Sequence, residues 1–187
     1  MNEPTFQERQ SPRRRVLLAG ISILASLVCS PSFAQVPNWR QFRRDDLGFI
    51  IDFPAAPTVT DEPEKDQDSD LIRSFHATFK FIDMEYDVGC EEYRKDINAQ
   101  EIWDHVAGVY TYHLPGVRLA SVVDLPGKFP TRHYIGEPDA ASRGQTAFMS
   151  SRNIVTERKW IACVVIAERP IETDGVARRF FDSFSLL

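Results

Sequence analysis

The fold is most readily worked out from Lys159–Ala167, which reads KWIACVVIA. From Trp160 to Ile166 it is apolar at both alternating sets of positions, whereas a strand with one solvated face alternates apolar with polar residues. We therefore predict a central strand that is covered on both faces. The turn Thr156-Glu157-Arg158 precedes it, and residues 145–155 before that turn predict its antiparallel hairpin partner.

The other predicted strands each have one apolar and one polar face. Residues 71–80 and 83–91 alternate apolar with polar side chains, which predicts a second hairpin with one buried face. Shorter alternating runs at 49–53, 117–123 and 132–135 add further strands. Together these runs predict an antiparallel sheet of about six strands.

Two main helices are predicted alongside the sheet. The first begins at an Asn98 cap, with Glu101 in the capping-box position. The second is capped by Thr173 or Asp174. The apolar residues that recur at helical spacing are Ile102, Val106 and Val109 in the first helix and Val176, Phe180 and Phe184 in the second. Because such stripes pack onto a sheet, the predicted fold class is α+β.

Residues 1–34 have the three parts of an export signal. A polar stretch ends in Arg13-Arg14-Arg15, an apolar run follows at 16–28, and small residues precede a cleavage bond. We predict cleavage between Ala34 and Gln35. The apolar run has 13 residues, whereas a membrane-spanning helix needs about 20, so no stable membrane span is predicted after cleavage.

Two export routes fit this signal. Arg13 and Arg14, followed by Val16 and Leu17, resemble the twin-arginine signal of bacterial proteins that are exported after folding. Pro12 stands where that consensus has Ser or Thr, so an ordinary secretory signal is the alternative. Both routes predict an exported bacterial protein in the periplasm.

The mature chain is predicted to comprise an entry segment at 35–46 and a single α+β domain at 47–187. Residues 1–34 hold four of the 22 basic and two of the 27 acidic residues, so 18 basic and 25 acidic residues remain, a net charge of −7. Phosphate binding depends on clustered Lys and Arg, and no basic run follows residue 44. We therefore predict an acidic protein that does not bind nucleic acid.

The sequence carries no recognisable catalytic, cofactor-binding or metal-binding motif. It lacks H-E-x-x-H, C-x-x-C, G-x-S-x-G and a Gly-rich phosphate loop. His76 and His105 fall on predicted polar faces, and the adjacent Glu91 and Glu92 would point to opposite faces of one strand. The acidic segment 61–70 lacks the ligand spacing of a calcium loop and predicts a solvated hairpin loop. We expect no catalytic, cofactor-binding or metal-binding residues.

Two cysteines remain in the mature chain, Cys90 and Cys163, because Cys29 lies in the signal. Both fall in predicted strands of a protein that enters an oxidising compartment. A disulfide between them would close a loop of 73 residues and add about 4 kcal/mol of stability. The alternative is two buried free thiols, since Cys also packs as a small apolar residue.

Several segments together resemble a family of small exported bacterial proteins of uncharacterised function. The segments are GFIIDFPAAP at 48–57, EYDV at 85–88, the late Arg-bearing hairpin and RFFDSF at 179–184. The resemblance implies a PsbP-like fold, an antiparallel sheet sandwiched by helices. It also implies an accessory or protein-binding role, such as that of the extrinsic subunit that supports the photosynthetic oxygen-evolving complex. No catalytic residue follows from it.

These observations predict a non-catalytic module that binds either an envelope protein or a small ligand between the sheet and a helix. One alternative is a hydrolase-type or other enzyme, for which a deep pocket would gather His133, Tyr134 and a carboxylate. The other alternative is a structural component of the cell envelope, which would expose an apolar patch of several hundred Å².

Overall fold

The computed structural model describes residues 37–64, 69–112, 116–140 and 147–187. The predicted signal, with Arg13, Arg14 and the Ala34/Gln35 cleavage bond, lies outside these residues. None of the described helices has the length and apolar character of a membrane-spanning segment.

Ten strands and two helices make up the described fold, an α+β architecture as predicted. The helices are α1 (Ala99–Tyr112) and α2 (Gly175–Ser183). A small antiparallel sheet has the order β1-β2-β10 and contains β1 (Arg40–Arg44), β2 (Phe49–Phe53) and β10 (Ser185–Leu186). A second antiparallel sheet has the order β3-β4-β5-β9-β8-β7-β6 and contains β3 (Thr58–Pro63), β4 (Leu71–Phe81), β5 (Met84–Tyr93), β6 (Val117–Leu125), β7 (Thr131–Pro138), β8 (Phe148–Val155) and β9 (Lys159–Ala167).

The prediction of about six strands in one sheet is wrong in number. β1 lies in the predicted entry segment, and β3 takes its last residues from the acidic segment 61–70 that was predicted to be a loop. Every residue of β3 is exposed, so it has no buried face to produce an alternating pattern. Its acidic residues and Pro63 are typical of an edge strand protected against further pairing.

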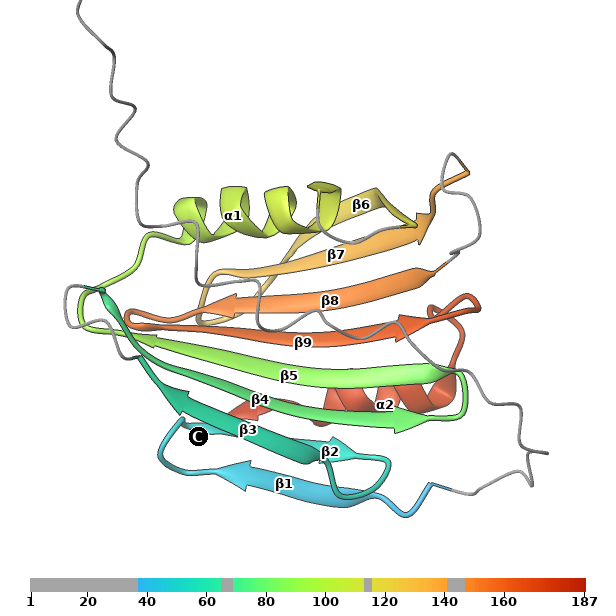
Figure 1. The fold of residues 1–187 in the computed structure, drawn as a ribbon, viewed down its shortest axis with the longest axis horizontal. Helices are drawn as coiled ribbons and strands as arrows, with labels where there is room; N and C mark the ends of the chain where they lie inside the picture. Colours follow the sequence, from blue (N-terminus) through green and yellow to red (C-terminus); the bar gives the residue numbers. More distant parts are fainter. Residues whose placement is uncertain (1–36, 65–68, 113–115, 141–146) are drawn as a thin grey trace, which may run out of the picture. The chain divides into compact units, whose positions relative to one another are not determined.

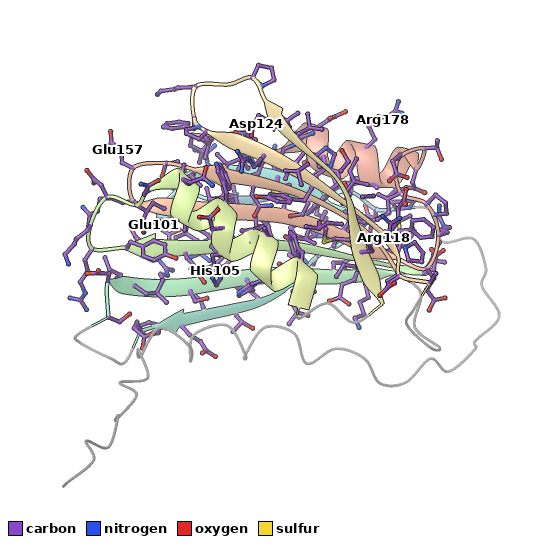
Figure 2. The ribbon with its side chains drawn as sticks, turned by 90° about the horizontal axis from the view of Figure 1, so that it is seen from above. Glu101, His105, Arg118, Asp124, Glu157 and Arg178 are labelled. Carbon is purple, nitrogen blue, oxygen red and sulfur yellow. The ribbon has the colours of Figure 1, made fainter. Side chains whose placement is uncertain are left out.

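The central position predicted for the KWIACVVIA strand is confirmed. β9 lies between β5 and β8 in the seven-stranded sheet. Ile161 and Cys163 on one face belong to the core cluster that contains α2, and Trp160 and Val164 on the other pack against the cluster that contains α1. Figure 2 shows the two helices on opposite sides of the sheet. We refer to these two faces as the α1 side and the α2 side.

The two sides of the sheet are covered at different ends (Figure 1). On the α1 side, Trp103 and Val106 of α1 pack with Tyr134 of β7 and Met149 of β8. On the α2 side, the buried residues of α2 and of the small sheet pack instead on β4, β5 and β9. The strands β6, β7 and β8 therefore keep a less covered surface on the α2 side, where His133 and Arg152 are only half-buried.

The predicted capping residues of both helices accept backbone hydrogen bonds, but among the described residues Glu101 does not complete the predicted capping box with Asn98. The Asn98 side chain accepts a hydrogen bond of 2.8 Å from the Gln100 backbone N–H at the start of α1. At α2 the structure selects Asp174 over Thr173, because the Asp174 carboxylate accepts bonds from the backbone N–H groups of Val176 and Ala177. The cap fixes where α2 begins, and hence where its far end meets the sheet.

Candidate functional site

A shallow cavity of about 310 Å³, largely open to solvent, lies on the α2 side, between the β6–β7 turn, β8 and the C-terminal strand. Its volume is at the lower end of the range for small-ligand sites. The lining residues are Leu125, Pro126, Lys128, Phe129, Thr131, Arg152, Ile154, Phe184, Ser185 and Leu186. Most of them are apolar, and the charged ones are two cations with no carboxylate among them. This cavity is the candidate functional site.

The β6–β7 turn forms one wall of the cavity. Leu125 is paired with Thr131 at the ends of the two strands, and the Thr131 hydroxyl donates a 3.0 Å hydrogen bond to the carbonyl of Phe129. The backbone N–H of Val155 in β8 donates a 3.0 Å bond to the Pro130 carbonyl. These bonds hold the turn against β8, and Figure 2 shows the turn on the same side of the sheet as α2.

The residues that follow α2 form the opposite wall. Phe184 caps α2 by donating its backbone N–H to the Phe181 carbonyl, and its ring lies 6.0 Å from that of Phe49. Leu186 is paired with Phe49 where β10 joins the small sheet. The wall is therefore held by backbone pairing and by aromatic packing.

Arg152 of β8 lines the cavity and also contacts the end of α2. Its Nη1 donates a 2.9 Å hydrogen bond to the Phe181 carbonyl, and its guanidinium carbon lies 5.5 Å from the centre of the Phe181 ring. Its Nη2 approaches the Asp182 carboxylate only to 4.0 Å. Among the described residues its buried Nε has no hydrogen-bond partner. The guanidinium thus has fewer acceptors than its five N–H donors require.

A histidine and a serine lie beside Arg152 on the same side of the sheet. His133 is paired with Arg152 across β7 and β8, and its Nε2 lies 2.7 Å from the Ser150 hydroxyl. Burial lowers the pKa of His133, and the positive charge of Arg152 lowers it further. The imidazole is therefore neutral at pH 7 and shares one hydrogen bond with Ser150, which is itself buried.

The pocket expected for an enzyme is not formed by these residues. Tyr134 follows His133 in β7, so the two side chains point to opposite sides of the sheet. Tyr134 is buried on the α1 side, where its ring lies 5.6 Å from that of Tyr110. In the described part of the chain no carboxylate hydrogen-bonds to His133. The combination of His133, Tyr134 and a carboxylate is thus not assembled.

The other titratable residues singled out in the sequence lie away from the cavity. His76 Nδ1 is 3.5 Å from the Asp87 carboxylate, and His105 packs edge-on against Trp160 at 5.9 Å. Glu91 accepts a hydrogen bond from Tyr93, whereas Glu92 approaches Lys159 at 3.9 Å. Within the described ranges no three His, Cys, Asp or Glu side chains are grouped so as to hold a metal ion.

His76 lies beside the acidic Asp87 and His133 beside the basic Arg152. Their pKa values should therefore lie on opposite sides of 6.5, the ordinary value for histidine. The hydrogen bond to Asp87 raises the pKa of His76, and burial lowers that of His133. His76 therefore adds stability below pH 6.5, which is lost as the pH rises through its native pKa. His133 has the reverse sign: stability falls as the pH drops from 6.5 through its lowered pKa.

Titration of the imidazole signals by NMR measures both values. Asp87→Asn should lower the pKa of His76 and leave that of His133 unchanged, so that His133 is the internal control. Indistinguishable titration of the two histidines in the unmodified protein would contradict this assignment.

Cys90 and Cys163 are both free and buried in the structure. Cys90 is paired with Ile161 and Cys163 with Val88, so the cysteines are diagonal neighbours on β5 and β9. Diagonal neighbours are about 7–8 Å apart, whereas bridged cysteines have Cα atoms about 4.4–6.8 Å apart. This register favours the free-thiol alternative. Burial raises the pKa of Cys90 to about 12 and also raises that of Cys163, which disfavours the reactive thiolate form of both.

No family model matches this chain, and no curated protein matches it. Among solved structures, the chain is similar to the crystal structure of a protein of unknown function, PA94, from Pseudomonas aeruginosa. The two are 8% identical, the match covers 69% of this chain and 82% of that chain, and the TM-score is 0.39. A similarity this remote gives no information about function.

Proposed function

We propose that this protein is an exported bacterial binding module that holds a small ligand in the cavity between the β6–β7 turn, β8 and the C-terminal strand. The observation that carries the proposal is the cavity itself, which combines an apolar lining with two cations. Concave, largely apolar sites with a few polar groups are the usual form of small-ligand sites. The export pattern of residues 1–34 and the resemblance to exported proteins with a PsbP-like fold support an accessory role outside the cytoplasm.

The two alternative roles, a hydrolase-type enzyme and a structural component of the cell envelope, have less support. A hydrolase would use Ser150 as a nucleophile and His133 as its base, but Ser150 is only 5% exposed and the base has no carboxylate to orient it. A structural envelope component would present a continuous apolar patch. The exposed large apolar side chains of the described chain are spread over four segments and are Val59, Ile82, Val122, Val123 and Leu187.

Native mass spectrometry of the purified full chain tests the proposal. Leu125→Trp should fill the cavity and release a co-purifying small molecule that the unmodified protein retains. The matched control is Val122→Trp, three residues earlier in β6, where the side chain is 48% exposed and paired with Tyr134 of the α1 side. This control should retain the molecule. Equal retention by both variants would place the ligand elsewhere and overturn the assignment.

Export is tested separately. N-terminal sequencing of the protein from the periplasmic fraction should begin at Gln35. An intact Met1 in the cytosol would contradict the proposed export.

A further inference from the structure

We propose that the ligand is a linear amphiphile, an unbranched apolar chain that ends in a carboxylate. This inference rests on the proposed function of the cavity and adds the chemical class of its ligand. It derives from three features of the lining, namely the sign of its charges, the incomplete pairing of Arg152, and the arrangement of its apolar residues.

The charges that line the cavity have one sign. Lys128 and Arg152 are cations, and no Asp or Glu lines the cavity, although the whole chain has a net charge of −5. An ammonium and a guanidinium that line one cavity favour an anionic group, and a guanidinium matches the geometry of a carboxylate. A cationic ligand would be repelled by both side chains.

Arg152 has capacity for another acceptor. Its Nη1 donates a hydrogen bond to the Phe181 carbonyl, whereas Nη2 only approaches the Asp182 carboxylate at 4.0 Å. The Asp182 side chain is 64% exposed, and such exposed ion pairs contribute little. A ligand carboxylate at Arg152 would therefore replace a weak contact rather than a strong one.

Lys128 is the second cation, and its exposed side chain can adjust its position to a ligand. It is exposed in the β6–β7 turn, and its Nζ lies 5.0 Å from the centre of the Phe129 ring. Among the described residues Lys128 has no carboxylate partner. Its ammonium group is thus available to an anionic group bound in the cavity that Lys128 lines.

The rest of the lining suits an apolar chain. Leu125, Phe129, Ile154, Phe184 and Leu186 come from three separate segments that meet at the cavity. A chain buried among them would gain affinity with length, by roughly fourfold for each additional methylene removed from water. The volume of about 310 Å³ limits the ligand to a single chain of modest length.

Isothermal titration calorimetry of the full chain at pH 8 with three probes tests this class. The probes are decanoate, decylammonium and decyl maltoside, each kept below its micellar concentration. They share the ten-carbon chain and differ in head-group charge. Decanoate should bind at least tenfold more tightly than the other two, and its affinity alone should fall as salt is raised.

Variants locate the head group and the chain. Lys128→Met should weaken decanoate binding about threefold to tenfold and Lys128→Glu should weaken it further, with little change in the binding of decyl maltoside. The control is Arg178→Met, which removes a cation from the outward face of α2 (Figure 2), away from the cavity lining. Arg152→Met tests the second cation, with circular dichroism to show that the loss of the Phe181 bond leaves the fold intact.

The outcomes separate this inference from the proposed function. If the three probes bind equally well and Leu125→Trp abolishes all binding, the cavity binds ligands but the anionic class is wrong. If decanoate binding survives Leu125→Trp, the amphiphile binds elsewhere and the inference fails. If no probe binds and Leu125→Trp releases no co-purifying molecule, the proposed function itself is overturned.

Discussion

Replacing Phe180 with alanine is expected to lower the free energy of unfolding by about 3–5 kcal/mol. The Phe180 side chain is fully buried. Its ring lies 5.3 Å from the rings of Phe53 and Tyr86 and 5.5 Å from that of Phe181. Because Phe53 belongs to the small sheet and Tyr86 to the large one, the cavity left by the alanine would loosen both sheets from α2.

Urea unfolding followed by circular dichroism measures this loss. Phe180→Leu removes less volume and should lower the free energy of unfolding by about 1 kcal/mol. It can be measured in place of the alanine variant if that variant does not fold. Phe129→Ala is the control for the loss of a phenyl ring, since Phe129 is only half-buried in a turn and should cost about 1 kcal/mol. Equal losses for Phe180→Ala and Phe129→Ala would show that Phe180 does not join the two sheets.

Adding one methyl group at Gly136 is expected to destabilise the protein by about 1–3 kcal/mol. A Cβ at this position in β7 would lie 2.4 Å from Cγ1 of Val117 and 3.2 Å from Cβ of Met149. Val117 is buried and branched at Cβ, so its restricted χ1 torsion makes it hard for the methyl group to turn away. The strain would fall on the pairing of β6 with β7, next to α1.

The matched control for this variant is Gly108→Ala in α1. A Cβ there meets no atom within 4 Å, and alanine is a better helix former than glycine by about 1 kcal/mol. The same substitution should therefore stabilise at Gly108 and destabilise at Gly136, as measured by the two unfolding midpoints. Changes of the same sign at both positions would contradict the packing described for β6 and β7.

Short-range patterns identified the buried strands and the helix starts. β9 was recognised because its residues are apolar on both faces, and the β4–β5 hairpin because apolar and polar residues alternate along it. β8 was predicted from its place before the turn at 156–158. The caps at Asn98 and Asp174 follow from the hydrogen-bonding capacity of their side chains. The strands β1 and β3 escaped prediction because their residues are mostly exposed, and exposed residues carry no alternating signal.

The cavity had no comparable signal. Its lining comes from the end of β6 and the following turn, from β8, and from the residues after α2. Arg152 was not singled out from the sequence, and its contact with Phe181 joins residues 29 positions apart. The dipeptide Pro126-Gly127 is typical of a turn, but nothing in it indicates which surface the turn will face.

Local sequence patterns were enough to predict an α+β domain with a doubly covered central strand and two capped helices. These properties depend on residues a few positions apart, where periodicity and capping act directly. The number of strands, the opposite placement of the two helices and the cavity with its two cations became apparent only in the three-dimensional fold. Those features depend on which distant segments pack together, and that is set by the shape and burial of whole elements rather than by any local pattern.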